Sequence, residues 1–558
     1  MDNERITGGG AGHFPGLKNR RHPLFSALAA SIASLAFVSL PSRCAGPVSP
    51  TGARSFFKVT VAGETLRAPN TPCEIDVDFA GILKKRGITG LFDPRSVYVE
   101  GRSSSAEEYS PVDFRLSEDF KYKSHGRLFW LVPVPAMTEF RVWFDARSSR
   151  RPGPADYVPA IGLGDEIMFN TDESSRFFAM SAPLLADYDG DGTTDVLAIN
   201  HYSDRFGAPY DGILCHPGIE ENGNGILTGD FFRLHYVPEG KSLSEAVPLH
   251  ARYNWVSAVD WDEDGLTDIL YVTIEQSEPE LRSLPENAGI FISAKFVTFL
   301  KNTGIKDAGG LPILREAARY PSEELTREAY VPSIACVDLD GDGTKDLAGV
   351  RTSPDGDVRV VTVFFFKNKG NDARGLPALE PPALLGTADG EPLKATQNAH
   401  LVSFGDVNGD GRIDIIGNDL SPTQTYWFEN MGGSPPVFKN RQILHGLPDE
   451  LKGYRWVRWR LGEGLLGLST SVLMLRTLDG SGFSFDPAGT LRETRGPLRG
   501  GAQEKPEWID WDEDGDQDLV AGEFTGLIHF YENVGTPSRP RFRPPVCVEA
   551  QGEPIRVY

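Results

Sequence analysis

The feature that most constrains this chain is an aspartate-rich nonapeptide that occurs five times. The copies span residues 187–195, 260–268, 338–346, 406–414 and 510–518. Each has a carboxylate at positions 1, 3, 5 and 9, except that Asn408 replaces one aspartate, and each has glycine at position 6. Oxygen donors spaced around a glycine turn in this way are typical of calcium-binding loops.

Four carboxylates in one short loop repel one another unless a hard cation lies among their oxygens. Calcium is the expected ion because it accepts about six to eight oxygens at flexible angles, whereas magnesium requires a near-regular octahedron and zinc prefers His and Cys, which these loops lack. A single Asp-Gly loop is also typical of a solvated hairpin, but five copies with one spacing favour metal binding. With the carbonyl of position 7 as a further ligand, the sequence predicts about five structural calcium sites. The predicted ligands are Asp187, Asp189, Asp191, Thr193 and Asp195; Asp260, Asp262, Asp264, Leu266 and Asp268; Asp338, Asp340, Asp342, Thr344 and Asp346; Asp406, Asn408, Asp410, Arg412 and Asp414; and Asp510, Asp512, Asp514, Asp516 and Asp518.

The segments that flank the loops predict β-strands. In an EF-hand an acid at position 12 closes the site and a helix follows, but position 12 is never acidic here. Short apolar segments stand on both sides instead, such as residues 256–259 before the second loop and 269–272 after it. Each loop is therefore expected to join two strands.

A second motif, which reads aromatic, bulky, charged, Asn, any, Gly, follows four of the loops. It occupies residues 299–304, 365–370, 427–432 and 530–535. Asn and Gly favour a turn, and a proline-containing segment such as 311–314 or 435–438 comes soon after it. Because proline cannot donate to a strand ladder, we expect this segment to be the outermost strand.

Each repeat thus predicts a four-stranded antiparallel sheet. Repeats of this length, whose sheets cannot bury their own faces, pack around an axis as the blades of a β-propeller. The loops begin 73, 78, 68 and 104 residues apart, and the last spacing leaves room for a blade without metal at 457–485. We therefore predict an all-β fold with a propeller of six or seven blades at 165–558. Either an early strand near 164–169 closes the ring or the ring is incomplete.

Three shorter regions precede the repeats. Residues 1–46 contain a 17-residue apolar run at 24–40 followed by small residues, which is typical of a secretory signal peptide; the alternative is an uncleaved N-terminal membrane anchor. Residues 52–150 alternate apolar and polar between Gly, Pro and Ser clusters, as in an antiparallel β-sandwich-like domain, and 151–164 form a linker. We expect a secreted, periplasmic or cell-surface protein, where calcium is abundant.

Charge and cysteine content narrow the partners. The 558 residues carry a formal net charge of −22, which disfavours a nucleic-acid partner. Five bound divalent ions would reduce the negative charge of the protein from −22 to −12. The five cysteines form no CxxC pair, so neither zinc binding nor thiol redox chemistry is indicated. Membrane association is expected only through an N-terminal anchor.

The acidic nonapeptides, their apolar strands and the aromatic-Asn-Gly turns resemble the FG-GAP/VCBS repeat proteins, whose blades also build the head of integrin α chains. The resemblance covers about residues 165–545, and the region before it is similar to β-domains that precede such repeats in secreted bacterial proteins. It implies a calcium-loaded propeller whose ions lie in the loop between the first two strands of a blade.

Three functions stay open. The first is a recognition module for a glycan or protein ligand, with tryptophans as stacking surfaces. The second is a polysaccharide lyase or another carbohydrate-active enzyme on a propeller scaffold; a lyase needs a base and a cation near the substrate. The third is a structural arm of a surface assembly. No Ser-His-Asp elbow, HExxH or phosphate loop marks an enzyme. The candidate tryptophans are Trp255, Trp261, Trp427, Trp456, Trp459, Trp508 and Trp511, and the candidate lyase groups are His201, Tyr202, His216, His235, Tyr236, His250, Arg252 and Tyr253.

Overall fold

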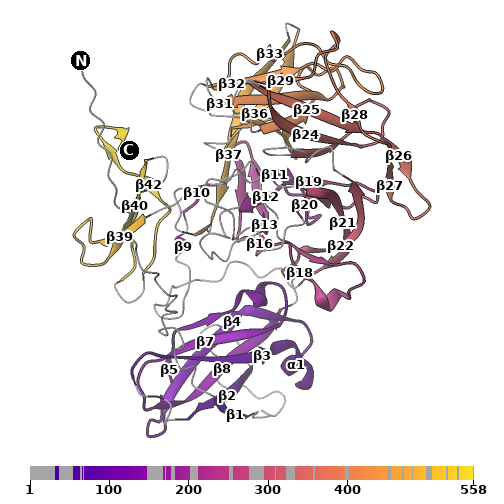
Figure 1. Cartoon of the computed structure of the whole chain (residues 1–558). Helices are drawn as coiled ribbons and strands as arrows, with labels where there is room; N and C mark the ends of the chain where they lie inside the picture. Colours follow the sequence, from indigo (N-terminus) through magenta and orange to yellow (C-terminus); the bar gives the residue numbers. More distant parts are fainter. Residues whose placement is uncertain are drawn as a thin grey trace, which may run out of the picture.

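The computed structural model shows a chain built almost entirely of β-strands in many small, mostly antiparallel sheets (Figure 1). Among the described residues α1 (Phe79–Lys85) is the single α-helix, and no helix there is long and apolar enough to cross a membrane. The described residues are 32–36, 55–62, 66, 68–147, 168–169, 171, 173–177, 183–200, 212–249, 256–274, 294–307, 309–321, 333–355, 358–395, 401–420, 423–448, 454–467, 471–480, 482–494, 496–497, 505–522, 526–536 and 540–556.

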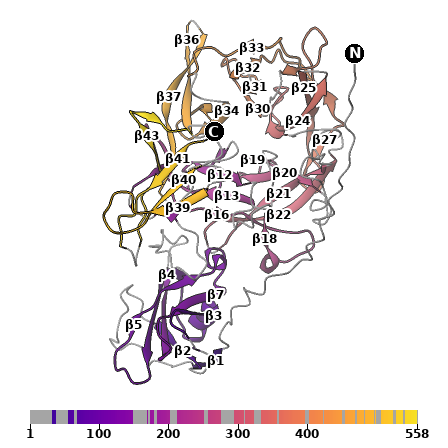
Figure 2. The ribbon, with the colours of Figure 1, turned by 60° about the vertical axis from the view of Figure 1, so that its left-hand side comes forward.

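The N-terminal part contains two antiparallel sheets that share one core, drawn in purple below the other sheets in Figures 1 and 2. Phe57, Phe79, Val99, Trp130 and Phe144 are among the buried residues that fill the core. Part of the apolar run predicted as a signal or anchor is strand β1, paired with β2. One sheet has the order β1 (Ile32–Ala36), β2 (Ser55–Val61), β8 (Met137–Arg147), β4 (Leu91–Ser103) and β5 (Ser110–Pro111), and the other β3 (Thr71–Asp78), β7 (His125–Val132) and β6 (Phe114–Leu116).

Helix α1 directly follows β3 inside the region 52–150, for which the sequence pattern predicted an antiparallel β-sandwich-like domain without a helix. The Asp78 carboxylate caps the helix by accepting the backbone N–H of Gly81 at 2.9 Å. Phe79, Ile82 and Leu83 turn into the core, so burial of one helical face stabilises the change from strand to helix.

Six further sheets follow, and each of five acidic loops joins the first two strands of one of them, as predicted. The remaining sheet, which begins with β34 and has no acidic loop, lies where the sequence predicted a blade without metal. In order from the first strand, the sheets are β11 (Leu184–Ala186), β12 (Asp195–Asn200), β13 (Gly212–His216) and β16 (Phe232–Arg233); β19 (Val256–Val259), β20 (Asp268–Ile274), β21 (Ala294–Lys306), β22 (Pro312–Pro321), β17 (His235–Val237) and β18 (Val247–Pro248); β23 (Ser333–Val337), β24 (Asp346–Asp355), β25 (Val358–Phe366) and β28 (Ala383–Leu384); β30 (Leu401–Gly405), β31 (Asp414–Leu420), β32 (Thr423–Phe428) and β33 (Gln442–Ile443); β34 (Tyr454–Trp459), β35 (Gly462–Gly467), β36 (Val472–Asp479), β37 (Gly482–Glu493), β15 (Gly225–Thr228) and β14 (Gly218–Asn222); and β39 (Lys505–Ile509), β40 (Asp518–Gly522), β41 (Ile528–Tyr531) and β42 (Val546–Cys547).

Five of these sheets contact one another in a closed cycle. Their first strands touch in the order β11, β19, β23, β30 and β34, and β34 touches β11 again. The cores repeat the cycle, because the two residues that follow each position 9 point to opposite faces of the second strand. Thus Val196 packs with Leu466 of β35 on one face, whereas Leu197 packs with Ile269 of β20 on the other.

The sheet of β34–β37, the last in the cycle, is extended by strands that come much earlier in the chain. β15 runs parallel to β37, and β10 (Ser175–Arg176) also pairs with β37. Gly225 has φ +112°, and a Cβ placed there would lie 2.0 Å from the carbonyl oxygen of Thr490, so this close approach requires glycine.

The prediction for the proline segments is wrong in its detail. β22 lies between β21 and β17 rather than at an edge, and residue Phe438 makes only isolated bridges, one of them to Asn430. The Asn-Gly turn folds the segment back at once, because Met431 donates its N–H to Val437 at 2.8 Å. Outer strands come later, as in β28 and β33. The remaining short pairs are β9 (Met168–Phe169) with β38 (Gly496–Pro497), β26 (Asn368–Asn371) with β27 (Pro377–Leu379), β29 (Lys394–Ala395) with β25, and β43 (Glu549–Ala550) with β44 (Glu553–Pro554).

Candidate metal centre

Position 9 of every loop is the first residue of the second strand and is almost fully buried. In the second loop Asp268 accepts two backbone N–H groups, that of Trp261 at 3.0 Å through Oδ2 and that of Asn302 at 2.7 Å through Oδ1. The other four loops repeat both bonds. Oδ2 of position 9 accepts the backbone N–H of position 2 of the same loop, and Oδ1 accepts the backbone N–H of a residue just after the third strand; these position 9 residues are Asp195, Asp346, Asp414 and Asp518. Position 9 therefore ties the loop to the third strand in the second loop and to the segment just after the third strand in the other four.

Burial of this carboxylate has an electrostatic cost. Desolvation raises the pKa of Asp268 to about 7, and the nearby carboxylates of Asp262 and Asp264 also raise it. Desolvation likewise raises the pKa of Asp346 to about 6 and that of Asp414 to about 7. A cation in the loop would stabilise the ionised form of these groups.

Position 1 shapes the turn itself in the first four loops. Asp260 accepts the N–H of Asp264 at 3.1 Å and that of Gly265 at 3.1 Å, and Asp187, Asp338 and Asp406 accept the corresponding groups. Gly265 has φ +86°, in the left-handed region that the turn requires. These hydrogen bonds hold the side chains of positions 1, 3 and 9 around a common point.

Four loops bring three carboxylates within 4.8 Å of one another, close enough to share a metal ion. The buried oxygens Asp262 Oδ1, Asp340 Oδ1, Asp510 Oδ1 and Asp516 Oδ1 accept no hydrogen bond, which leaves them free to contact a cation. The residues therefore fit a hard divalent ion. The triads are Asp187, Asp189 and Asp195; Asp260, Asp262 and Asp268; Asp338, Asp340 and Asp346; and Asp510, Asp512 and Asp514.

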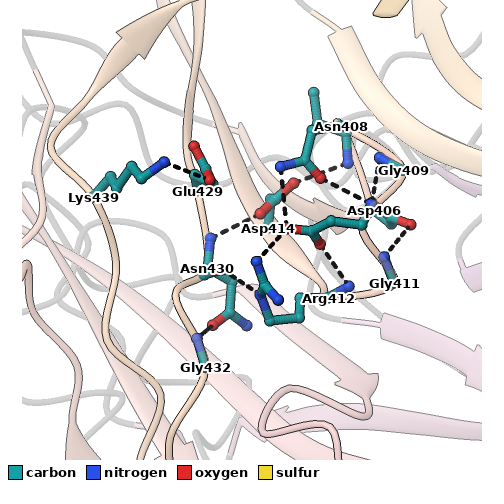
Figure 3. Close-up of polar contacts among 12 residues, drawn as sticks. Asp406, Asn408, Gly409, Gly411, Arg412, Asp414, Glu429, Asn430, Gly432 and Lys439 are labelled. Atoms are coloured by element: carbon teal, nitrogen blue, oxygen red, sulfur yellow. Dashed lines mark hydrogen bonds and ion pairs between the residues drawn. The ribbon is translucent and has the colours of Figure 1, made fainter. Parts of the chain in front are cut away.

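The fourth loop differs because Asn408 replaces a carboxylate and arginines surround it. Arg412 at position 7 donates to Asp410 and, through Nε, to the carbonyl of Asn430 at 2.7 Å (Figure 3). Arg476 of β36 reaches Asp406 with 3.5 Å between Nη1 and Oδ2. Of the five loops predicted to bind calcium, the loop 406–414 therefore has the weakest geometric support, because arginines pair with two of its three remaining carboxylates at positions 1, 5 and 9.

The residues predicted at position 7 act through their N–H groups in the described contacts. Thr193, Leu266, Thr344, Arg412 and Asp516 donate to the carboxylate at position 5 of their own loop at 2.9–3.0 Å. The sequence does not reveal that the Asn of the downstream turn is hydrogen-bonded to the acidic loop through both its backbone and its side chain. Asn302 Nδ2 donates to the carbonyl of Thr267 at 3.1 Å, and the other turn asparagines repeat this bond to position 8.

The aromatic and basic candidates are scattered. Trp261, Trp427, Trp456 and Trp459 are buried, whereas Trp508 is 51% and Trp511 50% exposed. Desolvation lowers the pKa of His216 to about 3 and that of His235 to about 4, so both rings are weak bases. Tyr236 lies in β17 and is partly buried. Outside the described residues lie Trp255, His201, Tyr202, His250, Arg252 and Tyr253.

Comparison of the chain with models of protein families and with curated proteins found no match.

Proposed function

We propose that this chain is an exported, calcium-stabilised β-propeller that recognises a glycan or protein ligand, as its resemblance to FG-GAP/VCBS repeats implies. The closed cycle of first strands supports a ring of five blades, fewer than the six or seven expected from the repeat count. The sheet β39–β42 carries the fifth acidic loop but is not part of that cycle, which accounts for one of the extra repeats.

Calcium is the proposed ion because the donors that the loops bring together are carboxylate oxygens, without His or Cys. When bound, the ion would neutralise the carboxylates of positions 1, 3, 5 and 9, and position 9 would also keep the two backbone N–H groups that tie the loop to the end of the third strand or the segment after it. Calcium would thus stabilise the junction between strands and leave the outer surface to ligands. An extracellular location would keep such loops filled, since calcium is abundant there.

The observation that carries the recognition role is the exposure of two tryptophans beside one acidic loop. Trp508 is the last residue but one of β39, the first strand of the sheet β39–β42, and Trp511 is position 2 of its loop. Each ring lies tilted against a neighbouring ring, Trp508 near Phe542 and Trp511 near Phe530, with ring centroids 6.0 and 5.9 Å apart. Rings held in place and half exposed can stack on sugar rings or anchor a protein partner.

The test is a glycan array followed by titration calorimetry on the purified full chain and on Trp508→Ala and Trp511→Ala. We expect binding that weakens at least about tenfold, or about 1.4 kcal/mol, in each variant. Ile443→Ala, which truncates an exposed apolar side chain of β33, is the control and should bind normally. Unchanged binding by both tryptophan variants would refute this surface, and release of unsaturated uronates from acidic polysaccharides would refute a binding-only role.

A further inference from the structure

The five acidic loops place chemically different residues at one equivalent position. The residue whose N–H reaches Oδ1 of position 9 defines the register, and it is Gly218, Asn302, Asn368, Asn430 or Asn533. The residue immediately before it is therefore equivalent in all loops. That residue is Pro217, Lys301, Lys367, Glu429 and Glu532 in turn.

The two lysines insert their ammonium groups among loop carboxylates. Lys301 Nζ contacts Asp262 and lies 2.7 Å from Asp264 Oδ2. Lys367 Nζ contacts Asp340 and lies 2.7 Å from Asp342 Oδ2. In both cases a single ammonium bridges positions 3 and 5, which are two of the predicted metal ligands.

The loop at 510–518 has the opposite character. Its equivalent residue, Glu532, adds a negative charge and pairs with Arg543 at 2.7 Å. Within the part of the chain that the structure describes, no Lys or Arg pairs with the aspartates of this loop, and Asp510 Oδ1 and Asp516 Oδ1 are buried without a hydrogen bond.

We propose that Lys301 and Lys367 serve as built-in cations of the loops 260–268 and 338–346, so that divalent ions bind the loop 510–518 before these two loops and more tightly. We call the first two the lysine loops and the third the carboxylate loop. The proposal rests on the calcium binding proposed above and assigns its order. An ammonium and a divalent ion compete for the same oxygens, because one cannot approach without displacing or repelling the other.

Calcium binding at the carboxylate loop would therefore affect the backbone next to the two exposed tryptophans, Trp508 and Trp511. Trp511 lies inside the carboxylate loop and its N–H donates to Asp518 at 2.9 Å, while Trp508 lies two residues before the loop. Ion binding there would fix the backbone that presents both rings. The lysine loops would meanwhile hold their strands together at any calcium concentration.

The test is calcium titration of the full chain by calorimetry, with tryptophan fluorescence as a second readout. In the native background, Asp512→Asn with Asp514→Asn should remove one site of high affinity and the calcium-dependent fluorescence change. Asp262→Asn with Asp340→Asn should leave both unchanged. Lys301→Met with Lys367→Met should raise the affinity of the lysine loops at least about tenfold and add two ions near the highest affinity. Lys241→Met, which removes a 3.1 Å contact to the exposed Glu245 outside the acidic loops, is the matched control and should change nothing.

Two results would overturn the proposal in distinguishable ways. Equal filling of all loops, with no effect of the lysine substitutions, would refute the order of binding and leave calcium binding intact. Absence of calcium binding to the native chain and to every variant would refute both the order and the calcium proposal. If the lysine variant does not fold, the two aspartate pairs still decide which loop binds first.

Discussion

Asp414 Oδ1 accepts a hydrogen bond of 2.8 Å from the backbone N–H of Asn430, across 16 residues of sequence (Figure 3). The same carboxylate accepts the N–H of Val407 at 2.9 Å through its other oxygen. One buried side chain thus joins the acidic loop, the second strand and the turn after the third. The equivalent contact occurs in every loop, so the junction of loop and strands in each of these sheets is a hydrogen-bonded unit as well as a candidate ion site.

Removal of the Asn430 side chain should destabilise the protein strongly. Asn430 is 1% exposed, and its Nδ2 donates to the carbonyls of Leu339 and Ile413 at 2.9 Å each. Asn430→Ala leaves these buried groups unpaired, so we expect a loss of about 2–3 kcal/mol in the free energy of unfolding. Chemical denaturation measures it. Asn440→Ala, at an exposed asparagine, should cost less than about 0.5 kcal/mol; an equal cost for both would contradict the role given to Asn430.

Closure of the cycle of sheets predicts a large effect at its seam. Leu466 of β35 is fully buried in the cluster that also contains Val196 of β12, although these residues are far apart in sequence. Leu466→Ala should lower the free energy of unfolding by about 2–5 kcal/mol through lost burial and the cavity formed. The exposed Leu478 supplies the matched substitution, Leu478→Ala, which should be nearly neutral. A neutral Leu466→Ala would show that the seam is not packed.

Glu493 predicts a pH dependence of stability. Burial raises its pKa from 4.5 to about 8, and it lies 3.9 Å from His216 Nδ1, whose ring is neutral in this range. Between about pH 4.5 and pH 8 the folded state retains a proton that the unfolded state has released, so the free energy of unfolding falls as pH rises, by up to about 1.4 kcal/mol per pH unit.

Denaturation of the native chain and of Glu493→Gln across this range tests the assignment. The variant should lose most of the slope and be the more stable protein at the upper end, because the amide needs no proton to remain neutral. A slope that is identical in both proteins would place the titrating group elsewhere. Glu549→Gln, at an exposed position, controls for the change in net charge.

The strands around the acidic loops could be predicted because each loop and its apolar neighbours are local in sequence. β19 spans Val256–Val259, as the pattern indicated, and position 9 begins the second strand throughout. The alternation of Ile269 and Leu270 between two cores also follows from strand geometry. Local pattern was therefore sufficient for the inner strands of each sheet.

The contacts between distant segments could not be predicted in this way. β17 and β15 leave their own repeat to join β22 and β37, through backbone hydrogen bonds that carry no side-chain signature. Trp261 and Trp511 occupy the same loop position, yet one is buried and the other exposed, because only the former has a Tyr320 hydroxyl and a neighbouring sheet beside it. The recurring Asn of the downstream turn was visible, but its contact with position 9 required the fold.

Calcium dependence of the melting temperature tests the central claim most directly. The purified full chain should melt at least about 5 °C higher with about 1 mM calcium than after EGTA treatment, because an ion that binds the folded loops stabilises them by mass action. Magnesium at the same concentration should not restore the difference. A melting temperature that is the same with calcium and with EGTA would contradict the assignment of the acidic loops as calcium sites.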